Sequence, residues 1–190
     1  AWKITIYLGV GSLVLLGGLI ALYSNLAGAG SATFNIAELT AAAGKIGLDK
    51  EVQKWIFLPL FLGFGILVSL FPFHSWAAPA YACAPTSVAM LHAGVLKKFG
   101  LYGILRVAMP ILPDGFEAWE SLILILLLGN IIYVGLVTVY QRYLDRMLGN
   151  SSVMHMGYAF LGIACVNDIG WNGAVLMMFA HGISIALLFA

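Results

Sequence analysis

Long apolar runs separated by short polar connections dominate the chain, and each run predicts a transmembrane helix. Six such runs can be laid out: residues 4–26, 52–70, 86–109, 118–140, 151–166 and 173–190. About 20 apolar residues are enough for a helix to cross the hydrocarbon core of a bilayer. Trp2 and Lys3 precede the first run, and Lys54 and Trp55 open the second, a pairing that anchors helices at membrane interfaces. We therefore predict an all-α, polytopic helical bundle.

The connections between the runs differ in character. The longest covers residues 27–51, and within it Ile36, Leu39 and Ile46 have the spacing of a short amphipathic helix lying along the surface. The polar segment 141–150 separates the fourth run from the fifth. Its basic residues favour a cytoplasmic location for that connection, although the counts are too small to decide the orientation.

The stretch after the second run has an unusual pattern. Residues 71–85 read FPFHSWAAPAYACAP, with three prolines and no charged residue. Proline lacks an amide donor and clashes with the preceding turn, so a regular helix is not expected to continue through this stretch. An apolar, irregular backbone is tolerated at membrane depth only where protein or a water-filled cavity shelters it. We therefore predict a connection tucked into the bundle.

Composition narrows the class of protein. Hydrophobic residues make up 62% of the 190 positions and charged residues only 9%, and the mean hydropathy is +1.00. Soluble domains carry about 25% charged residues, so these values predict an integral membrane protein. A net charge of +1 provides no basic face for nucleic acid. No nucleotide-binding, metal-binding or redox motif is present, so no cofactor is expected in this chain.

Two further features are the cysteines and the two ends of the sequence. Cys83 and Cys165 both lie in apolar stretches and are expected to be small buried thiols. Position 1 is alanine, and the last run stops while it is still apolar. We interpret residues 1–190 as an internal fragment of one longer multi-span membrane domain.

The most informative residue is a lysine inside the third run. Lys98 lies about 16 Å from the end of its run at about 1.5 Å per residue, too deep to reach the interface comfortably. Its burial costs about 2.5–3.5 kcal/mol on insertion scales. Because a buried lysine can bind and release a proton near neutral pH, Lys98 is expected to be functional. Lys97 lies about 100° round the helix and is expected to reach a carbonyl or water near the helix edge.

Histidines accompany this lysine on four different segments: His74, His92, His155 and His181. Histidine titrates near physiological pH and can pass a proton through either ring nitrogen. Four of them with a deep lysine favour a proton relay over four separate packing residues. No pair has the close spacing of metal or haem ligands, so a metal site is the weaker hypothesis. Ser151 and Ser152 are able to hold water for a relay, or equally to bond one helix to another.

The acidic residues are placed differently from the bases. Carboxylates are expected in loops or at the ends of runs, and Asp114, Glu117 and Glu120 in a loop before the fourth run. Asp145 and Arg146 fall in the connection 141–150, where they are expected to be solvated or paired. A lysine that pumps protons usually needs a carboxylate partner to tune it. Such a partner is therefore expected outside residues 1–190.

Several motifs follow one another in a familiar order: FPFHSW (71–76), AP (84–85), SVAMLHAGVLKKFGLYGILR (87–106), NSSVMHMGY (150–158) and FAHGISIALLF (179–189). This order resembles the antiporter-like membrane subunits of respiratory complex I, in particular the type called chain M in bacteria and chain 4 in mitochondria. The resemblance implies a bundle of about fourteen spans, built from two inverted repeats with broken helices. The present chain would cover the later part of the first repeat and the start of the second.

The resemblance also implies roles for individual residues. Lys98 matches the central lysine of the broken helix, the principal proton-loading site. His74 matches the histidine of the FPFH turn, and His155 and His181 match histidines of a hydrophilic axis along the membrane midplane. Arg146 matches a basic residue near the start of the following helix. The residues expected to assist these are His92, Arg146 and Ser152.

The chain departs from the family pattern at several places. The family usually has a K-x-P triplet where residues 67–69 read Leu-Val-Ser, so the family lysine at Leu67 is lost. Its L-P-D-A-H segment reads AAPAY at residues 77–81, and Asp145 replaces a lysine. His92 and Lys97 stand where the family normally has leucines. These departures keep open a structural membrane subunit that has lost transport.

The leading hypothesis is a non-redox, proton-translocating subunit of a complex I-like NADH:quinone oxidoreductase. Its expected partners are other membrane subunits and the lipid bilayer, in a bacterial plasma membrane or a mitochondrial inner membrane. The alternatives are a subunit of a cation/proton antiporter or of a membrane-bound hydrogenase, and a structural subunit; sodium in place of protons also stays open. An intramembrane enzyme using Ser152 and His155 is disfavoured because no convergent nucleophile and base is apparent.

Overall fold

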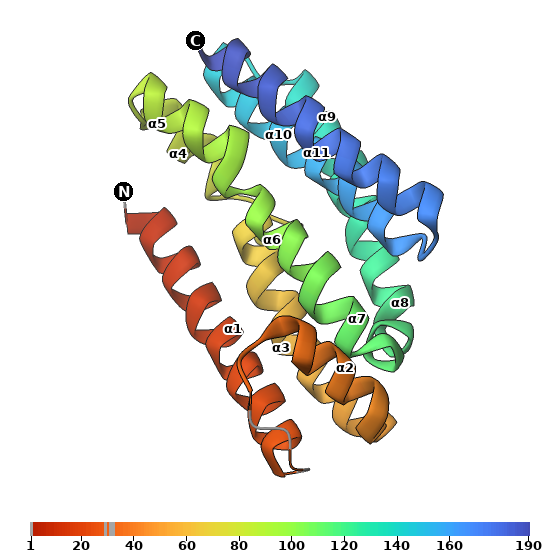
Figure 1. Ribbon diagram of the computed structural model, residues 1–190. Coiled ribbons are helices and arrows are strands. Elements are labelled where there is room, and N and C mark those ends of the chain that lie inside the picture. The colour runs from red at the N-terminus through yellow and green to blue at the C-terminus, as the bar shows by residue number, and fades with distance from the viewer. Residues whose placement is uncertain (1, 29, 31–32) are drawn as a thin grey trace.

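The computed structural model describes residues 2–28, 30 and 33–190, in which the regular elements are all helices and no strand occurs (Figure 1). The separate helices are α1 (Trp2–Gly28), α2 (Ile36–Ile46), α3 (Lys50–Val68), α4 (Ala77–Cys83), α10 (Leu144–Ala164) and α11 (Asp168–Phe189). Two further helices each contain wider π turns and so carry several labels. The first is α5 (Thr86–Leu91), η1 (His92–Leu96), α6 (Lys98–Gly103), η2 (Ile104–Ala108) and α7 (Met109–Ile111). The second is α8 (Pro113–Leu128), η3 (Gly129–Tyr133) and α9 (Val134–Val139).

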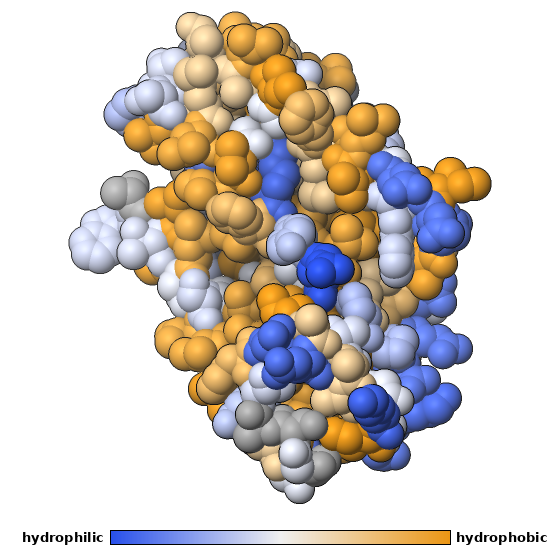
Figure 2. All heavy atoms as spheres, in the orientation of Figure 1, coloured by the Kyte–Doolittle hydropathy of each residue, from blue (hydrophilic) through white to orange (hydrophobic). Residues whose placement is uncertain are grey.

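Among the described residues, five helices are long and apolar enough to cross a membrane: α1, α3, the broken helix Thr86–Ile111, the helix Pro113–Val139 and α11. The more polar α10 runs beside α11, and the broken helix lies between this pair and α3 (Figure 1). Large apolar side chains remain exposed along the helices, Leu13 at 70% and Val139 at 80% among them. Apolar residues cover much of the face in Figure 2, as expected for a surface that meets lipid.

The fourth run is helical from an earlier residue than the sequence suggests. The helix begins at Pro113, whose missing amide is not needed in a first turn. Asp114, Glu117 and Glu120 therefore lie on the first turns of α8, and their predicted placement in a loop is wrong. Negative side chains at this end of a helix are stabilised by the positive end of its dipole.

The connection 27–51 contains the predicted amphipathic helix, now α2, which is confirmed. The side chain of Asn35 caps it by accepting from the amide of Ala37 at 3.0 Å, and Gly47 ends it in the left-handed conformation with φ 64°. Leu39 is buried on its inner face. Residues 29, 31 and 32 of this connection lie outside the described residues.

Both cysteines are exposed, so their predicted burial is wrong. Cys83 is the last residue of α4, and Cys165 follows the last residue of α10. Each therefore lies at a helix end, and neither is on a packed helix face.

The irregular connection between α3 and α4 is folded into the bundle, as predicted. Trp76 at its end is only 1% exposed, and the indole nitrogen donates to the carbonyl of Ile66 at 3.3 Å. The prolines do not exclude a helix completely, because Pro79 lies in the first turn of α4. Amides in a first turn have no partner within the helix, so proline is tolerated there.

Asn130, on the π turn η3, holds this connection to two helices. Its side chain is fully buried. The side-chain oxygen accepts from the amide of Phe71 at 3.0 Å, and the side-chain nitrogen donates to the carbonyl of Val153 at 2.9 Å. Phe71 belongs to the irregular connection and Val153 to α10, so one amide group joins three parts of the chain.

The broken helix and α11 approach each other through two glycines. A Cβ atom added to Gly182 would lie 2.8 Å from the carbonyl oxygen of Gly94, and one added to Gly94 would lie 3.2 Å from the carbonyl oxygen of Gly182. Backbones this close leave no space for a side chain between them. The pair therefore sets the separation of the two helices at the level of Lys98.

Replacing Asn130 with alanine is expected to lower the free energy of unfolding by about 1–3 kcal/mol, because the buried amide of Phe71 loses its partner. The measurement is thermal unfolding of the full-length protein in detergent. Asn25→Ala is the matched control, since Asn25 is exposed and bonds only the carbonyl of Ala21 in its own helix. Equal losses in the two variants would contradict the bridging role of Asn130.

Gly182→Ala is expected to force α11 away from the broken helix and to cost about 1–3 kcal/mol of stability. Gly173 lies on the same helix, and a Cβ atom there would meet nothing within 4 Å. Gly173→Ala should therefore be neutral or slightly stabilising, because alanine favours helix more than glycine does. The midpoint of thermal unfolding compares the two, and similar midpoints would show that the close approach is unimportant.

Candidate functional site

Lys98 opens α6, directly after a widened turn of the broken helix. In this turn the amide of Lys97 donates to the carbonyl of His92 at 3.1 Å, five residues back. Such single π turns within α-helices are frequent at functional sites. The Lys98 ammonium donates to the carbonyl of Ala93, a group at the same interruption. The helix is thus irregular where it carries its two lysines.

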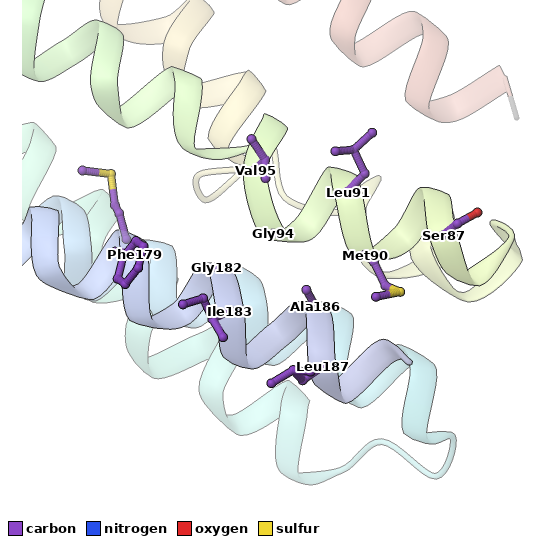
Figure 3. Close-up of a pocket in the computed structure, with 11 residues that line it drawn as sticks. Ser87, Met90, Leu91, Gly94, Val95, Phe179, Gly182, Ile183, Ala186 and Leu187 are labelled. Carbon is purple, nitrogen blue, oxygen red and sulfur yellow. The ribbon is translucent and has the colours of Figure 1, made fainter.

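Lys98 borders a groove between the broken helix and α11. One hollow of about 640 Å³ is lined by Met90, Leu91, Gly94 and Val95 on one side and by Phe179, Gly182, Ile183, Ala186 and Leu187 on the other (Figure 3). The adjoining hollow, about 430 Å³, includes Lys98 with Phe99 and Tyr102. Lys98 is the only charged residue of this lining, and the Tyr102 phenol is its other polar side chain.

His181 and His155 form a stacked pair across α11 and α10. Their ring centroids are 5.1 Å apart and their planes differ by 11°. The hydroxyl of Ser152 lies 3.1 Å from Nε2 of His181, and both of these side chains are buried. Nδ1 of His155 lies 2.7 Å from the carbonyl oxygen of Ser151, to which it donates. The other ring nitrogen of His155 is therefore its proton acceptor.

Lys98 lies next to this pair. Its Cε atom is 3.9 Å from the position of a Cβ atom on Gly182, the residue after His181. Lys98 and His181 are close enough to interact electrostatically, as are His181 and His155. The structure thus brings together four of the predicted site residues: Lys98, His181, His155 and Ser152. Groups of these types can each hold or pass a proton.

His74 lies apart from the stacked pair, in the connection between α3 and α4. Its ring packs against Phe71, with centroids 5.6 Å apart, and against Tyr133 at 5.9 Å. Nδ1 of His74 is buried and has no hydrogen-bond partner among residues 2–28, 30 and 33–190. It lies close enough to Lys97 for an electrostatic interaction.

Lys97 is not at the helix edge and reaches no carbonyl of the described residues, so that part of its expected placement is wrong. Its side chain is fully buried, and its Nζ atom lies 5.7 Å from the centroid of the Tyr81 ring. Nζ has no hydrogen-bond partner within the described part of the chain. The broken helix packs against α4 on one side and against α11 on another. Lys97 and Lys98, although adjacent, therefore both face protein.

His92 also belongs to the Lys97 side of the helix. Its Nδ1 atom is 3.2 Å from the hydroxyl of Tyr81, and its ring meets that of Trp76 edge to face, with centroids 5.6 Å apart. It is therefore not part of the Lys98–His181–His155 group. The sequence analysis did not predict Tyr81 as a polar partner of His92. The only sign of Tyr81 in the sequence was that the segment 77–81 differs from the family pattern.

Arg146 lies on the first turn of α10, away from both groups. It is exposed, and its guanidinium lies 5.7 Å from the centroid of the Tyr143 ring. Asp145 is exposed beside it. Asn130 is a further residue that the sequence analysis missed, although a single amide within the apolar run LLLGNIIYV is a signal for a buried polar contact.

The electrostatic character of the site is basic. The buried polar and charged residues of the described chain include Lys97 and His181 but no carboxylate. The ion pairs found lie at the polar end of α3, Lys50 with Asp114 at 3.3 Å and Lys54 with Glu51 at 3.7 Å. Within the described ranges no three His, Cys, Asp or Glu side chains are grouped to hold a metal ion.

Comparisons with known proteins give relatives along the whole chain. NAD(P)H-quinone oxidoreductase chain 4 3 of Picosynechococcus sp. is 36% identical over 189 residues, covering 100% of this chain and 33% of the relative. NADH-quinone oxidoreductase subunit M of Rickettsia prowazekii is 34% identical over 189 residues, with 100% and 37% covered. The chain thus spans about a third of the length of these curated relatives.

Solved structures show the same fold. A chain of respiratory complex I from Thermus thermophilus with bound NADH superposes with a TM-score of 0.88 and 29% identity, covering 99% of this chain and 39% of that one. A chain of the Mrp complex from Dietzia sp. gives a TM-score of 0.84 at 24% identity, with 98% and 33% covered. The second likeness concerns the fold alone.

The resemblance stated from the motifs and the prediction of an all-α transmembrane bundle are both confirmed by these findings. The protein is an integral membrane protein. Because the family described as NADH:quinone oxidoreductase/Mrp antiporter, transmembrane, matches residues 1–190, the chain belongs to that family.

Proposed function

We propose that the protein is a non-redox, proton-translocating membrane subunit of a complex I-like NADH:quinone oxidoreductase. The observation that carries this proposal is the placement of Lys98 beside the stacked His181–His155 pair, with the Ser152 hydroxyl in contact. The names of its relatives, quinone oxidoreductase chain 4 and subunit M, support the same assignment.

The proposed path begins at Lys98. A protonated lysine is held by the carbonyl of Ala93, and the neutral amine can accept a proton once that charge is lost. His181 on α11 is the next group, and its Nε2 atom contacts the Ser152 hydroxyl. Parallel stacked imidazoles do not hydrogen-bond face to face. Transfer between His181 and His155 therefore runs through this hydroxyl or through a bridging water.

His74 is proposed to serve the same translocation from the connection between α3 and α4. Its buried Nδ1 atom lacks a partner among the described residues, so the imidazole is free to exchange a proton there. His92, Arg146 and Ser152 are proposed as auxiliary residues. Arg146 differs from the other two because its side chain is exposed, at the start of α10.

The chain is proposed to work with other membrane subunits in the bilayer and to need no cofactor of its own. Its buried charged groups are bases, so the acidic partner of Lys98 is proposed to lie in another part of the protein or in a neighbouring subunit. A bacterial plasma membrane or a mitochondrial inner membrane is the proposed location. Redox chemistry is assigned to other chains of the assembly.

A second candidate is a subunit of a cation/proton antiporter or of a membrane-bound hydrogenase. The similarity of its fold to a chain of the Mrp complex supports this second candidate. A subunit that has lost transport is the third reading, motivated by Leu67 and Asp145 in place of family lysines. A purified assembly without NADH oxidation would favour the second candidate, and sodium-dependent activity would favour sodium as the coupling ion.

Lys98→Met, in the full protein within its assembly, is expected to lower severalfold the protons moved per NADH oxidised in proteoliposomes, because the proton-loading amine is removed. Lys45→Met is the control, since Lys45 is exposed on α2. If the ratio and the turnover are unchanged at matched assembly, Lys98 is not on the path and the subunit is a scaffold.

Ser152→Ala is expected to slow proton movement severalfold, because the hydroxyl that contacts His181 is lost. Ser184→Ala is the matched control, since Ser184 is exposed on α11 and bonds only the carbonyl of Ala180. Proton uptake by proteoliposomes during NADH oxidation measures both. Equal rates in the two variants would show that the path does not use this hydroxyl.

A further inference from the structure

The broken helix carries a second lysine that the proposed path does not use. Lys97 is the one Lys, Arg, Asp or Glu side chain of the described residues that is buried. Its side chain points toward α4, whereas Lys98 points toward α11. Burying an ammonium is costly unless it is paired, and no partner for Nζ occurs within the described ranges. A group retained in such a place requires an explanation.

Polar groups are gathered around this lysine in an otherwise apolar setting. The Tyr81 ring lies 5.7 Å from Nζ, and the Tyr81 hydroxyl is 3.2 Å from Nδ1 of His92. Trp76, Ala93 and other apolar side chains of the same cluster surround them. The result is a short series of an amine, a phenol and an imidazole, of which the amine and the phenol are buried and the imidazole is half-buried.

His74 supplies a second buried nitrogen without a partner. Its Nδ1 atom, like Nζ of Lys97, is buried and unbonded to any described residue, and the two side chains are close enough to interact electrostatically. Buried polar atoms in proteins nearly always have a hydrogen-bond partner, either protein or ordered water. Each of these two atoms is therefore a candidate to bind an ordered water.

The charges that face this group are all basic. Lys98, on the same helix, interacts electrostatically with Lys97, and so does His181 on α11. Lys3, on α1, interacts with His74. No carboxylate of the described chain is buried near them. The positive charges that these groups can carry are therefore not balanced by a buried carboxylate of the described chain.

Three polar side chains from two helices meet in this cluster. Tyr81 belongs to α4, and His92 and Lys97 belong to the widened turn of the broken helix. They are 5 to 16 residues apart in the chain, yet their side chains contact one another. A leucine at position 97 would fill the site without burying a charge. Their convergence favours a shared role over three separate packing residues.

We propose that Lys97, with Tyr81 and His92, forms a second intramembrane proton-binding site that exchanges protons with His74 through a bridging water. In the exchange the Lys97 ammonium loses a proton to the water as the water gives one to Nδ1 of His74. This leaves a neutral amine and an imidazolium, and the reverse reaction reloads the lysine. The inference rests on the proposed function and extends it to a second face of the broken helix.

The test compares Lys97→Leu, His92→Leu and the double variant in the full protein within its assembly. Proton output per NADH is measured in proteoliposomes across a range of pH, with Lys45→Leu as the exposed control. Lys97→Leu should lower the output severalfold and shift its pH profile, while thermal stability is unchanged or higher. Because the residues act as a unit, the double variant should lose no more than Lys97→Leu does.

A Lys97→Leu protein with unaltered output and pH profile would overturn the inference. If Lys98→Met still lowers the output, the proposed function stands without the second site; if it does not, the proposed function fails as well. Should Lys97→Leu fail to assemble, Tyr81→Phe decides, since it keeps the ring beneath Nζ and removes only the hydroxyl. A shifted profile in Tyr81→Phe supports the site, and an unshifted one rejects it.

Discussion

The structure depends on the requirement that backbone polar groups inside a bilayer find partners within the protein. Regular helices meet it by themselves, but the connection between α3 and α4 does not. In that connection the side chain of Asn130 provides a partner, because it accepts from the amide of Phe71 while it donates to the carbonyl of Val153. This single side chain allows an irregular segment to lie inside the bundle, and that segment places His74 and Trp76 next to the broken helix.

Close helix packing then determines which titratable side chains lie beside one another. Gly94 and Gly182 let the broken helix and α11 approach with no side chain between them. Lys98 consequently lies beside His181, whose ring stacks on His155 of the neighbouring α10. The site is therefore built from three helices, and its geometry depends on small residues that carry no chemistry themselves.

The two adjacent lysines divide the broken helix into two chemically different faces. Lys98 faces a groove beside α11 and bonds the carbonyl of Ala93, whereas Lys97 is enclosed against Tyr81. Both are bases in a region whose buried residues include no carboxylate of the described chain.

Residue order alone determined the helical class, the membrane location and the irregular connection, because these follow from local apolarity, run length and proline chemistry. Depth along a run was likewise enough to mark Lys98. The burial of Lys97, the contact of Tyr81 with His92 and the stacking of His155 on His181 were decided by the tertiary structure. The physical reason is that periodicity places residues around one helix, whereas the side chain that each meets depends on which helices pack against it and how closely.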